Sequence, residues 1–491
     1  MKIAHTATNF WANDGVEFND TYNVTGTPGT DVPVSVNTVN IQSNVSPTGV
    51  TFNNTAPLDY TVSSSNGSGI LTGALIKNGT GKATITSAKS YAGSTPINAG
   101  RINIQNNTAL GATSVVNVAS GAALEIQGGI SVNARPLSLN GAGLTASPAG
   151  ALRNVSGANT YAGLITLGGS ATVQVDAGSL DLTNTGGITG SGFGLTVAGA
   201  GTGNLAGRIN TGAGSVTKNN AGTWTLSGVN TFTGATAINA GTLIIGGAGQ
   251  LGSGNYAGAI TNDGTLTYSS TANQTLSGVI SGAGALVLNG TTGAGPLATQ
   301  TPTLTISNAN SYSGGTTING GTVRIDTLNA AGLGTGTVTV NGGNFLFGSN
   351  MTVANNFVLS GGGIYARDNT NTLNGTLTIN AGGTTSYLGE RYDRKTLNIN
   401  GEVFGSGNVT LANVVAPFNV DGNNFRGNNV QFSNTNVSTY NGTVTIVNDG
   451  FTTLFLNATN ALANATINAG LTHLNPLRQY KYYNLYESYL I

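Results

Sequence analysis

Charged side chains that could act together in catalysis or ligand binding gather in one short stretch of this chain. Charged residues make up only 7% of the 491-residue sequence, yet five of them fall between Glu390 and Lys395, close to Tyr387. Two carboxylates at a suitable separation are enough for glycoside hydrolysis. The simplest interpretation of the stretch is a loop whose charges are paired and solvated.

A second group about twenty residues earlier would extend this stretch into a patch. Tyr365 precedes Arg367 and Asp368, and in a chain of stacked coils equivalent positions lie above one another. The candidate glycan patch therefore takes residues from both groups: Tyr365, Arg367, Asp368, Tyr387, Glu390, Arg391, Asp393 and Arg394. Catalysis by this patch is the less favoured alternative, and no residue is assigned as catalytic.

Other kinds of chemistry have little support in the sequence. His5 and His473 lie near opposite ends of the chain and cysteine is absent, so catalytic triads, thiol catalysis and metal sites are not expected. The glycine strings 199–203 and 332–336 lack the Lys-Ser/Thr that ends a phosphate-binding loop. Segment 246–251 has glutamine where a calcium-binding repeat needs aspartate. We therefore expect no metal and no cofactor.

The composition predicts strands and turns. Glycine supplies 76 residues, and threonine, valine and asparagine are abundant, which favours pleated strands joined by tight turns. Lysine plus arginine equal aspartate plus glutamate, 17 against 17, so no net charge is available to hold nucleic acid or an anionic membrane. No apolar run reaches the length of about eighteen residues that a transmembrane helix needs. The absence of cysteine agrees with export into an oxidising compartment.

One phrase recurs along the chain: an alternating strand, an aromatic residue, a glycine two positions later, and a second alternating strand. Its clearest copies occupy residues 84–104, 225–245 and 305–325, with a degenerate copy at 154–167. The aromatic and glycine anchors of the four copies are Tyr91 and Gly93, Tyr161 and Gly163, Phe232 and Gly234, and Tyr312 and Gly314. Successive aromatic anchors are 70, 71 and 80 residues apart, which is longer than one coil of a repeat protein.

This period predicts an all-β fold, a right-handed parallel β-solenoid that forms a single elongated rod. Each repeat would span three or four coils of about twenty residues, because one coil cannot bury its apolar face alone. With about 4.8 Å between stacked strands, the rod would be on the order of 100 Å long. A β-sandwich is the rival fold, but it does not require so long a period.

The repeated aromatic and asparagine residues are interpreted as structural. We expect the aromatic anchors to pack in the core or over the corners of the coils. We expect Asn230, Asn239, Asn310 and Asn319 to stack as amide ladders that satisfy backbone groups at the corners.

The phrase resembles the autotransporter-associated β-strand repeat, most closely at residues 222–243 and 303–323. The resemblance covers roughly residues 65–345. It implies a parallel β-helical passenger of a Gram-negative bacterium, carried to the outer surface by a C-terminal membrane barrel. The sequence after residue 345 stays rich in glycine and asparagine, so we do not expect that barrel in this chain. Residues 1–10 lack the apolar stretch of a secretory signal, so we do not expect a signal peptide either.

The resemblance and the changes in amino-acid composition and repeat regularity divide the chain into four segments. Residues 1–64 would form an N-terminal capping segment, in which Trp11 closes the first coil. Residues 65–345 would form the repeat solenoid, and residues 346–475 a less regular continuation. The tyrosine-rich residues 476–491 would form a C-terminal cap or tail.

The leading functional interpretation is an extracellular structural or adhesive stalk at the bacterial surface, associated with the outer membrane. One alternative is a self-assembling extracellular filament subunit that depends on residues 476–491. Another is a carbohydrate-active β-helix enzyme, a polysaccharide lyase or hydrolase, acting near residues 365–395. The expected partners are a surface glycan, a surface protein or further copies of the chain, and nucleic acid is not expected.

Overall fold

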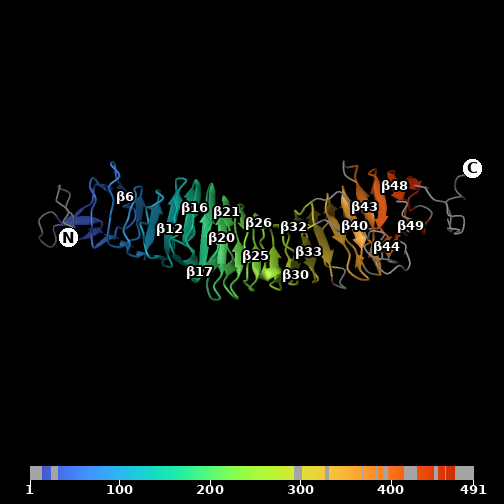
Figure 1. Ribbon diagram of the computed structural model, residues 1–491, viewed down its shortest axis with the longest axis horizontal. Helices are drawn as coiled ribbons and strands as arrows, with labels where there is room; N and C mark the ends of the chain where they lie inside the picture. Colours follow the sequence, from blue (N-terminus) through green and yellow to red (C-terminus); the bar gives the residue numbers. More distant parts are fainter. Residues whose placement is uncertain are drawn as a thin grey trace, which may run out of the picture.

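The protein is a long β-solenoid. The computed structural model describes residues 14–23, 31–146, 149–291, 301–326, 331–367, 369–381, 385–390, 396–413, 428–446, 452–458 and 461–469. These residues are all-β, about 1% helical, and stack parallel strands in about 17 turns. Figure 1 shows a rod whose N-terminal coils, in blue, lie at one end and whose C-terminal coils, in red, lie at the other. The predicted all-β parallel solenoid is confirmed.

The first sheet has 20 strands in two ladders that share β17 (Ile165–Val175). The first ladder adds β1 (Gly15–Phe18), β5 (Gly49–Phe52), β7 (Leu75–Lys77), β9 (Thr95–Ile97), β11 (Val116–Val118), β14 (Leu137–Gly141), β19 (Ile188–Thr189) and β22 (Ile209–Asn210). The second adds β4 (Thr38–Asn40), β6 (Tyr60–Ser63), β8 (Lys82–Ile85), β10 (Gly100–Ile104), β12 (Ala122–Gln127), β15 (Leu152–Ser156), β20 (Leu195–Gly199), β23 (Val216–Lys218), β25 (Thr236–Ile238), β28 (Ile260–Asn262) and β31 (Ile280–Ser281).

The second sheet is a single ladder of 13 strands. Its strands are β13 (Ser131–Val132), β16 (Ala158–Tyr161), β18 (Ser179–Leu182), β21 (Thr202–Leu205), β24 (Thr223–Leu226), β26 (Thr242–Gly247), β29 (Thr265–Ser270), β32 (Ala285–Leu288), β34 (Thr316–Ile318), β36 (Val338–Val340), β39 (Phe357–Leu359), β42 (Leu377–Ile379) and β45 (Val403–Gly405). It therefore spans most of the rod.

Two further sheets complete the C-terminal coils. The third sheet contains β27 (Asn255–Tyr256), β30 (Gln274–Leu276), β33 (Thr303–Ile306), β35 (Thr322–Ile325), β37 (Asn344–Leu346), β40 (Gly362–Ala366), β43 (Ser386–Glu390), β46 (Val409–Asn413), β48 (Thr443–Ile446) and β50 (Thr466–Ala469). The fourth contains β38 (Thr352–Val353), β41 (Thr370–Leu373), β44 (Thr396–Ile399), β47 (Asn428–Phe432) and β49 (Thr452–Leu456). Near the N-terminal end, β2 (Thr21–Asn23) and β3 (Asp31–Pro33) form an antiparallel hairpin, and a 3₁₀ turn, η1 (Gly252–Gly254), precedes β27.

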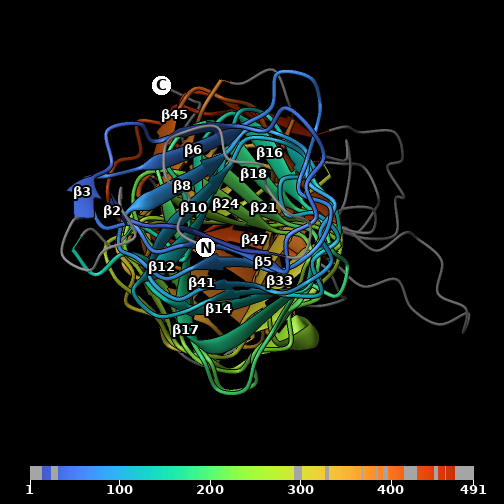
Figure 2. The same ribbon diagram turned by 90° about the vertical axis from the view of Figure 1, so that its left-hand side faces the viewer.

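Alternation along each strand determines which side chains enter the core. In β24, Trp224 and Leu226 are fully buried, whereas Thr223 and Thr225 face outward. Strand β26 stacks on β24 so that Trp224 lies opposite Leu243. Because parallel stacking in register keeps the same face of every coil inward, the apolar columns merge into one core along the rod, which Figure 2 views end-on.

The register also gives the length of each coil. Leu243 pairs with Leu266, and Leu266 pairs with Leu286, so successive coils there contain 23 and 20 residues. The next coil is longer, because Leu286 pairs with Thr316, 30 residues on. At about 4.8 Å per turn, about 17 turns make a stack roughly 80 Å long.

Corner glycines let adjacent coils approach closely. Gly199 has a φ of +104°, and a Cβ added there would lie 1.9 Å from the carbonyl oxygen of Val175 in the coil below. Both the backbone conformation and the space therefore require glycine at this corner. The second and third sheets continue across residue 345, while Trp11 and residues 476–491 lie outside the described residues, so the division into four segments stays a prediction.

Candidate functional site

The structure removes Tyr365 from the predicted glycan patch, because its side chain is buried. Tyr365 is fully buried in β40, and its ring folds over Gly363 and packs against Leu346, with Tyr387 partly buried beside them. Burial also raises the pKa of its hydroxyl. Tyr365 therefore cannot contact a ligand in solution, and its assignment to a surface patch is wrong.

The remaining patch residues are only partly described. Asp368, Arg391, Asp393 and Arg394 lie outside the described residues, as does the side chain of Glu390. The patch as a set stays a prediction.

Arg367 belongs to a small charged cluster on the third sheet that the sequence did not single out. Its guanidinium lies 3.6 Å from the Asp326 carboxylate, and Arg324 binds the same carboxylate at 2.6 Å. Asp326 is thus shared by Arg324 of its own coil and by Arg367, which lies two coils further on.

The aromatic anchors lie inside the rod. Tyr91, Tyr161, Phe232 and Tyr312 are buried, each with at most 1% of its surface exposed. The hydroxyls of Tyr312 and Thr316 share a hydrogen bond of 2.6 Å, and Tyr161 donates to the Arg135 carbonyl at 2.7 Å. Burial raises the pKa of the three tyrosines, so they stay neutral donors. A sugar-stacking ladder is excluded at these positions.

The glycines beside the anchors have a packing reason. A Cβ at Gly163 would lie 1.8 Å from the Arg135 carbonyl oxygen, and one at Gly93 would lie 2.5 Å from the Gly73 carbonyl oxygen. Cβ atoms at Gly234 and Gly314 would lie 2.4 Å from backbone atoms of the preceding coil. The aromatic-x-glycine phrase therefore combines a core side chain with a corner that touches the coil below.

The recurring asparagines have two different roles. Asn239 donates to the Asn219 side chain at 2.7 Å, and Asn319 donates to Asn289 at 2.8 Å, so these exposed amides form ladders between coils. Asn230 is instead buried, and its Oδ1 accepts from the backbone N–H of Ile209 at 2.9 Å. Asn310 acts in the same way on the backbone of Ile280. The predicted amide ladders therefore occur at Asn239 and Asn319. The buried Asn230 and Asn310 accept hydrogen bonds from backbone N–H groups and form no ladder with each other.

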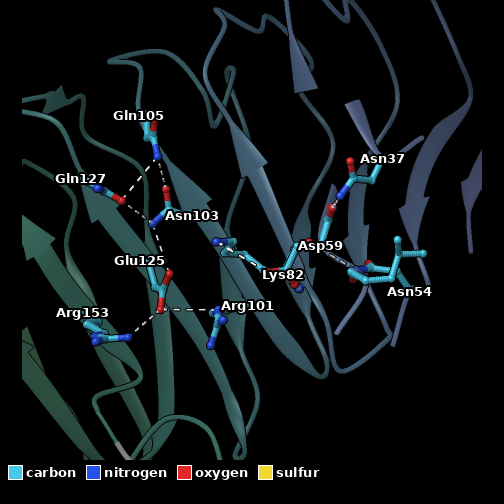
Figure 3. A network of polar contacts seen from close by, with 11 residues as sticks. Asn37, Asn54, Asp59, Lys82, Arg101, Asn103, Gln105, Glu125, Gln127 and Arg153 are labelled. Carbon is cyan, nitrogen blue, oxygen red and sulfur yellow. Dashed lines mark hydrogen bonds and ion pairs between the residues drawn. The ribbon is translucent and has the colours of Figure 1, made fainter. Parts of the chain in front are cut away.

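A polar network that sequence reasoning missed covers the outer side of the first sheet (Figure 3). The Glu125 side chain is 5% exposed, lies 3.8 Å from Arg101 and binds Arg153 at 2.9 Å. Arg153 also binds Asp176 at 2.5 Å. Asn103 donates to the Glu125 carboxylate at 3.2 Å. The network links successive coils and balances two positive with two negative charges.

Partial burial acts to lower the pKa of Arg153, but the Asp176 hydrogen bond and the Asp176 and Glu125 charges outweigh it, so the pKa is raised. The arginine therefore keeps its charge in this network. The signal in the sequence is a charged residue every 23 to 28 positions, which becomes visible only when the coil lengths are known.

Two lysines point into the rod, which sequence reasoning also missed. Lys77 ends β7 and Lys218 ends β23, and both are fully buried. The Lys218 ammonium donates to the carbonyls of Asn219, Asn220 and Ala240 at 2.9, 2.6 and 3.0 Å. Burial lowers the pKa of both lysines to about 8.

Three short segments of the chain match a family model described as the passenger-associated-transport-repeat, at residues 75–104, 216–245 and 301–325. Over 83 residues the chain is 45% identical to the adhesin BmaC autotransporter of Brucella suis biovar 1 (strain 1330). The chain is an autotransporter passenger-like repeat protein. The aligned part covers 16% of the passenger-like chain and only 2% of that adhesin. No solved structure matches the chain.

The matched segments of the passenger-like chain coincide with its structural anchors. Each contains one buried aromatic anchor and its glycine, and the first two also contain the buried lysines. In the strand that precedes the third match, Leu288 occupies the position of those lysines. The match to a passenger repeat implies a protein at the cell surface or outside the cell.

Within the described part of the passenger-like chain, no three His, Cys, Asp or Glu side chains gather as a metal site. The same residues include no helix long and apolar enough to cross a membrane.

Proposed function

We propose that this passenger-like chain is a rigid, non-enzymatic stalk that contributes an adhesive surface outside the cell. The observation that supports the proposal most is the single apolar core, which joins side chains from Val16 to Leu462. Bending such a rod would open contacts between stacked coils, so the stack keeps its length. A rod of this kind holds exposed side chains away from the surface that carries it.

The outer charges of the rod support a structural role for the polar groups. The Glu125 network joins neighbouring coils, and the Asp326 carboxylate joins Arg324 of its own coil to Arg367 two coils further on. The enzymatic alternative near residues 365–395 loses Tyr365, which is buried, and Arg367, which is paired with Asp326. The remaining outward surface is dominated by threonine, serine and asparagine, which suits contact with another surface.

The test attaches the purified chain to beads through a C-terminal tag. The beads are passed over immobilised matrix proteins, mucins and polysaccharides, and both bead retention and released reducing sugars are measured. We expect retention on at least one surface without sugar release. Beads carrying the chain after thermal unfolding serve as the control. Release of reducing sugars, or retention no better than that of the unfolded control on every surface, would refute the proposal.

A further inference from the structure

Eight successive coils of the second sheet present an outward surface that the adhesive role has not yet explained. We call this surface, which belongs to β24, β26, β29, β32, β34, β36, β39 and β42, the threonine face. Its first column is Thr223, Thr242, Thr265, Ala285, Gly315, Thr337, Asn356 and Thr376. Its second is Thr225, Ile244, Thr267, Val287, Thr317, Thr339, Val358 and Thr378. Its third is Ser227, Gly246, Ser269, Asn289, Asn319, Asn341, Ser360 and Asn380.

The threonine face is regular. Strands β24 to β42 pair in continuous register, whereas pairings in the first sheet shift at β12 and β14. The second column consists entirely of β-branched residues, and all of them but Thr267 are partly exposed. Such a column forms a continuous ridge of methyl and hydroxyl groups along the rod.

The threonine face carries no charge along its eight coils. Acidic residues mark its two ends: Asp181 lies two coils before Thr225 in the second column, and Glu402 follows Thr376 in the first. The Asp326 cluster lies on the third sheet beside the later coils of this face, and the Glu125 network lies on the first sheet in coils that precede it. In the coils of β24 to β32 the outward residues Thr217, Ala237, Thr261 and Ser281 of the first sheet are uncharged as well. The threonine face is therefore distinguished by its three regular columns over eight coils, and not by the lack of charge alone.

The chemistry of this face limits what it can bind. Without lysine or arginine it cannot hold nucleic acid or an anionic surface by counterion release. Its three columns contain no aromatic residue on which a sugar ring could stack. Flat β-surfaces of small and β-branched side chains do pack tightly against surfaces like themselves. Two uncharged faces of the same kind also approach without repulsion.

The area is sufficient for a partner of this kind. Eight strands at about 4.8 Å, and three outward positions at about 6.8 Å along each strand, cover roughly 38 by 20 Å. Two such faces together would bury about 1,500 Å², within the range of specific protein interfaces.

We propose that the threonine face is the surface through which two copies of this chain associate side by side. The proposal rests on the adhesive role above and deepens it, because the partner is a second copy of the stalk. A two-fold contact uses the same surface of both copies. We expect reversible association with a dissociation constant of about 10 µM, because the interface lacks large aromatic anchors.

The first test is sedimentation equilibrium of the full chain over a hundredfold range of concentration. Thr317→Lys places a charge in the middle of the threonine face. Thr305→Lys is the matched control, because Thr305 also faces outward in mid-strand, but in β33 of the third sheet beside Arg324. We expect the unaltered chain and the Thr305→Lys variant to dimerise equally, and Thr317→Lys to dimerise at least tenfold more weakly. Circular dichroism of both variants confirms that each is folded.

The absence of cysteine from the chain allows a second test. Thr317→Cys and Thr305→Cys are treated with a short bis-maleimide at a concentration where the chain associates. We expect a crosslinked dimer only from Thr317→Cys. A chain that stays monomeric throughout, equal weakening by the two lysine variants, or equal crosslinking of the two cysteine variants would overturn the proposal. The bead assay is run at concentrations below dimerisation, so adhesion to other surfaces and self-association can fail separately.

Discussion

Replacing Lys218 by leucine should remove a pH dependence from the stability of the central coils. The folded chain lowers the pKa of Lys218 from 10.5 to about 8 through burial. Since a tenfold change in proton affinity corresponds to about 1.4 kcal/mol, the charged lysine costs the folded state about 3 kcal/mol relative to the unfolded chain. Leu288 already occupies the corresponding position before the third repeat, so the site accepts a leucine side chain.

The sign follows from proton binding. Below about pH 8 Lys218 is protonated in both the folded and the unfolded chain, and above about pH 10.5 it is neutral in both. In these two ranges it does not change the free energy of unfolding as the pH varies. Between these two pH values Lys218 is protonated in most unfolded chains but neutral in most folded ones. Because the unfolded state then binds more protons, the free energy of unfolding increases as the pH rises. The unaltered chain should therefore gain about 3 kcal/mol from Lys218 across this window, and Lys218→Leu should lose that gain.

The free energy of unfolding of both proteins is measured at about pH 7 and at about pH 10.5, and the change between the two pH values is compared. Effects that do not depend on pH, such as the three carbonyls that lose their hydrogen-bond donor, cancel in this comparison. The measurement is urea unfolding followed by the fluorescence of Trp224, which is buried in the next strand of the same coil. A local reporter is needed because stacked repeats need not unfold as one unit. Leu288→Lys is the reciprocal variant and should acquire the same slope. Parallel pH profiles for the unaltered chain and Lys218→Leu would refute the reasoning.

Three further substitutions test the contacts between coils, each by urea unfolding. Gly163→Ala should destabilise its coils by at least about 3 kcal/mol, because the new Cβ would lie 1.8 Å from the Arg135 carbonyl oxygen. Glu125→Gln should cost about 2 to 3 kcal/mol, because it leaves two arginines without their shared carboxylate. Tyr312→Phe should cost about 1 kcal/mol, because it removes the hydrogen bond to Thr316 and little volume.

The first two of these have a control in the chain. Gly192→Ala has a positive φ but no atom within 4 Å of the added Cβ, so it separates backbone strain from collision and should cost less than Gly163→Ala. Asp59→Asn breaks an exposed pair with Lys82 and should cost at most about 1 kcal/mol. An equal loss from Asp59→Asn and Glu125→Gln would contradict the account of the buried network, and an unchanged Tyr312→Phe would contradict that of the anchor hydroxyl.

The features that could be predicted from the sequence depend on neighbours along the chain. The repeated phrase predicted that its aromatic anchors pack in the core or over the corners, and the spacing of these anchors predicted stacked coils. The Glu125 network could not be predicted, because its members are 23 to 28 residues apart and meet only at one set of coil lengths. Tyr365 was placed on the surface because it precedes the charged residues Arg367 and Asp368, but Leu346 and Tyr387 on the adjacent strands pack against it.

The buried polar groups also bear on how so repetitive a chain finds one register. A slip of one residue would expose Trp224, so alternation alone prevents it. A slip of one whole coil is different, because Leu226 and Ile245 occupy equivalent positions and could exchange at little cost. Lys218 and Asn230 are instead polar core positions that the other coils do not repeat in every turn, and they bond the backbone of Ala240 and Ile209 in the adjacent coils. We infer that the stability lost by burying such groups is retained because it excludes coil slips, as polar residues do in other repetitive folds.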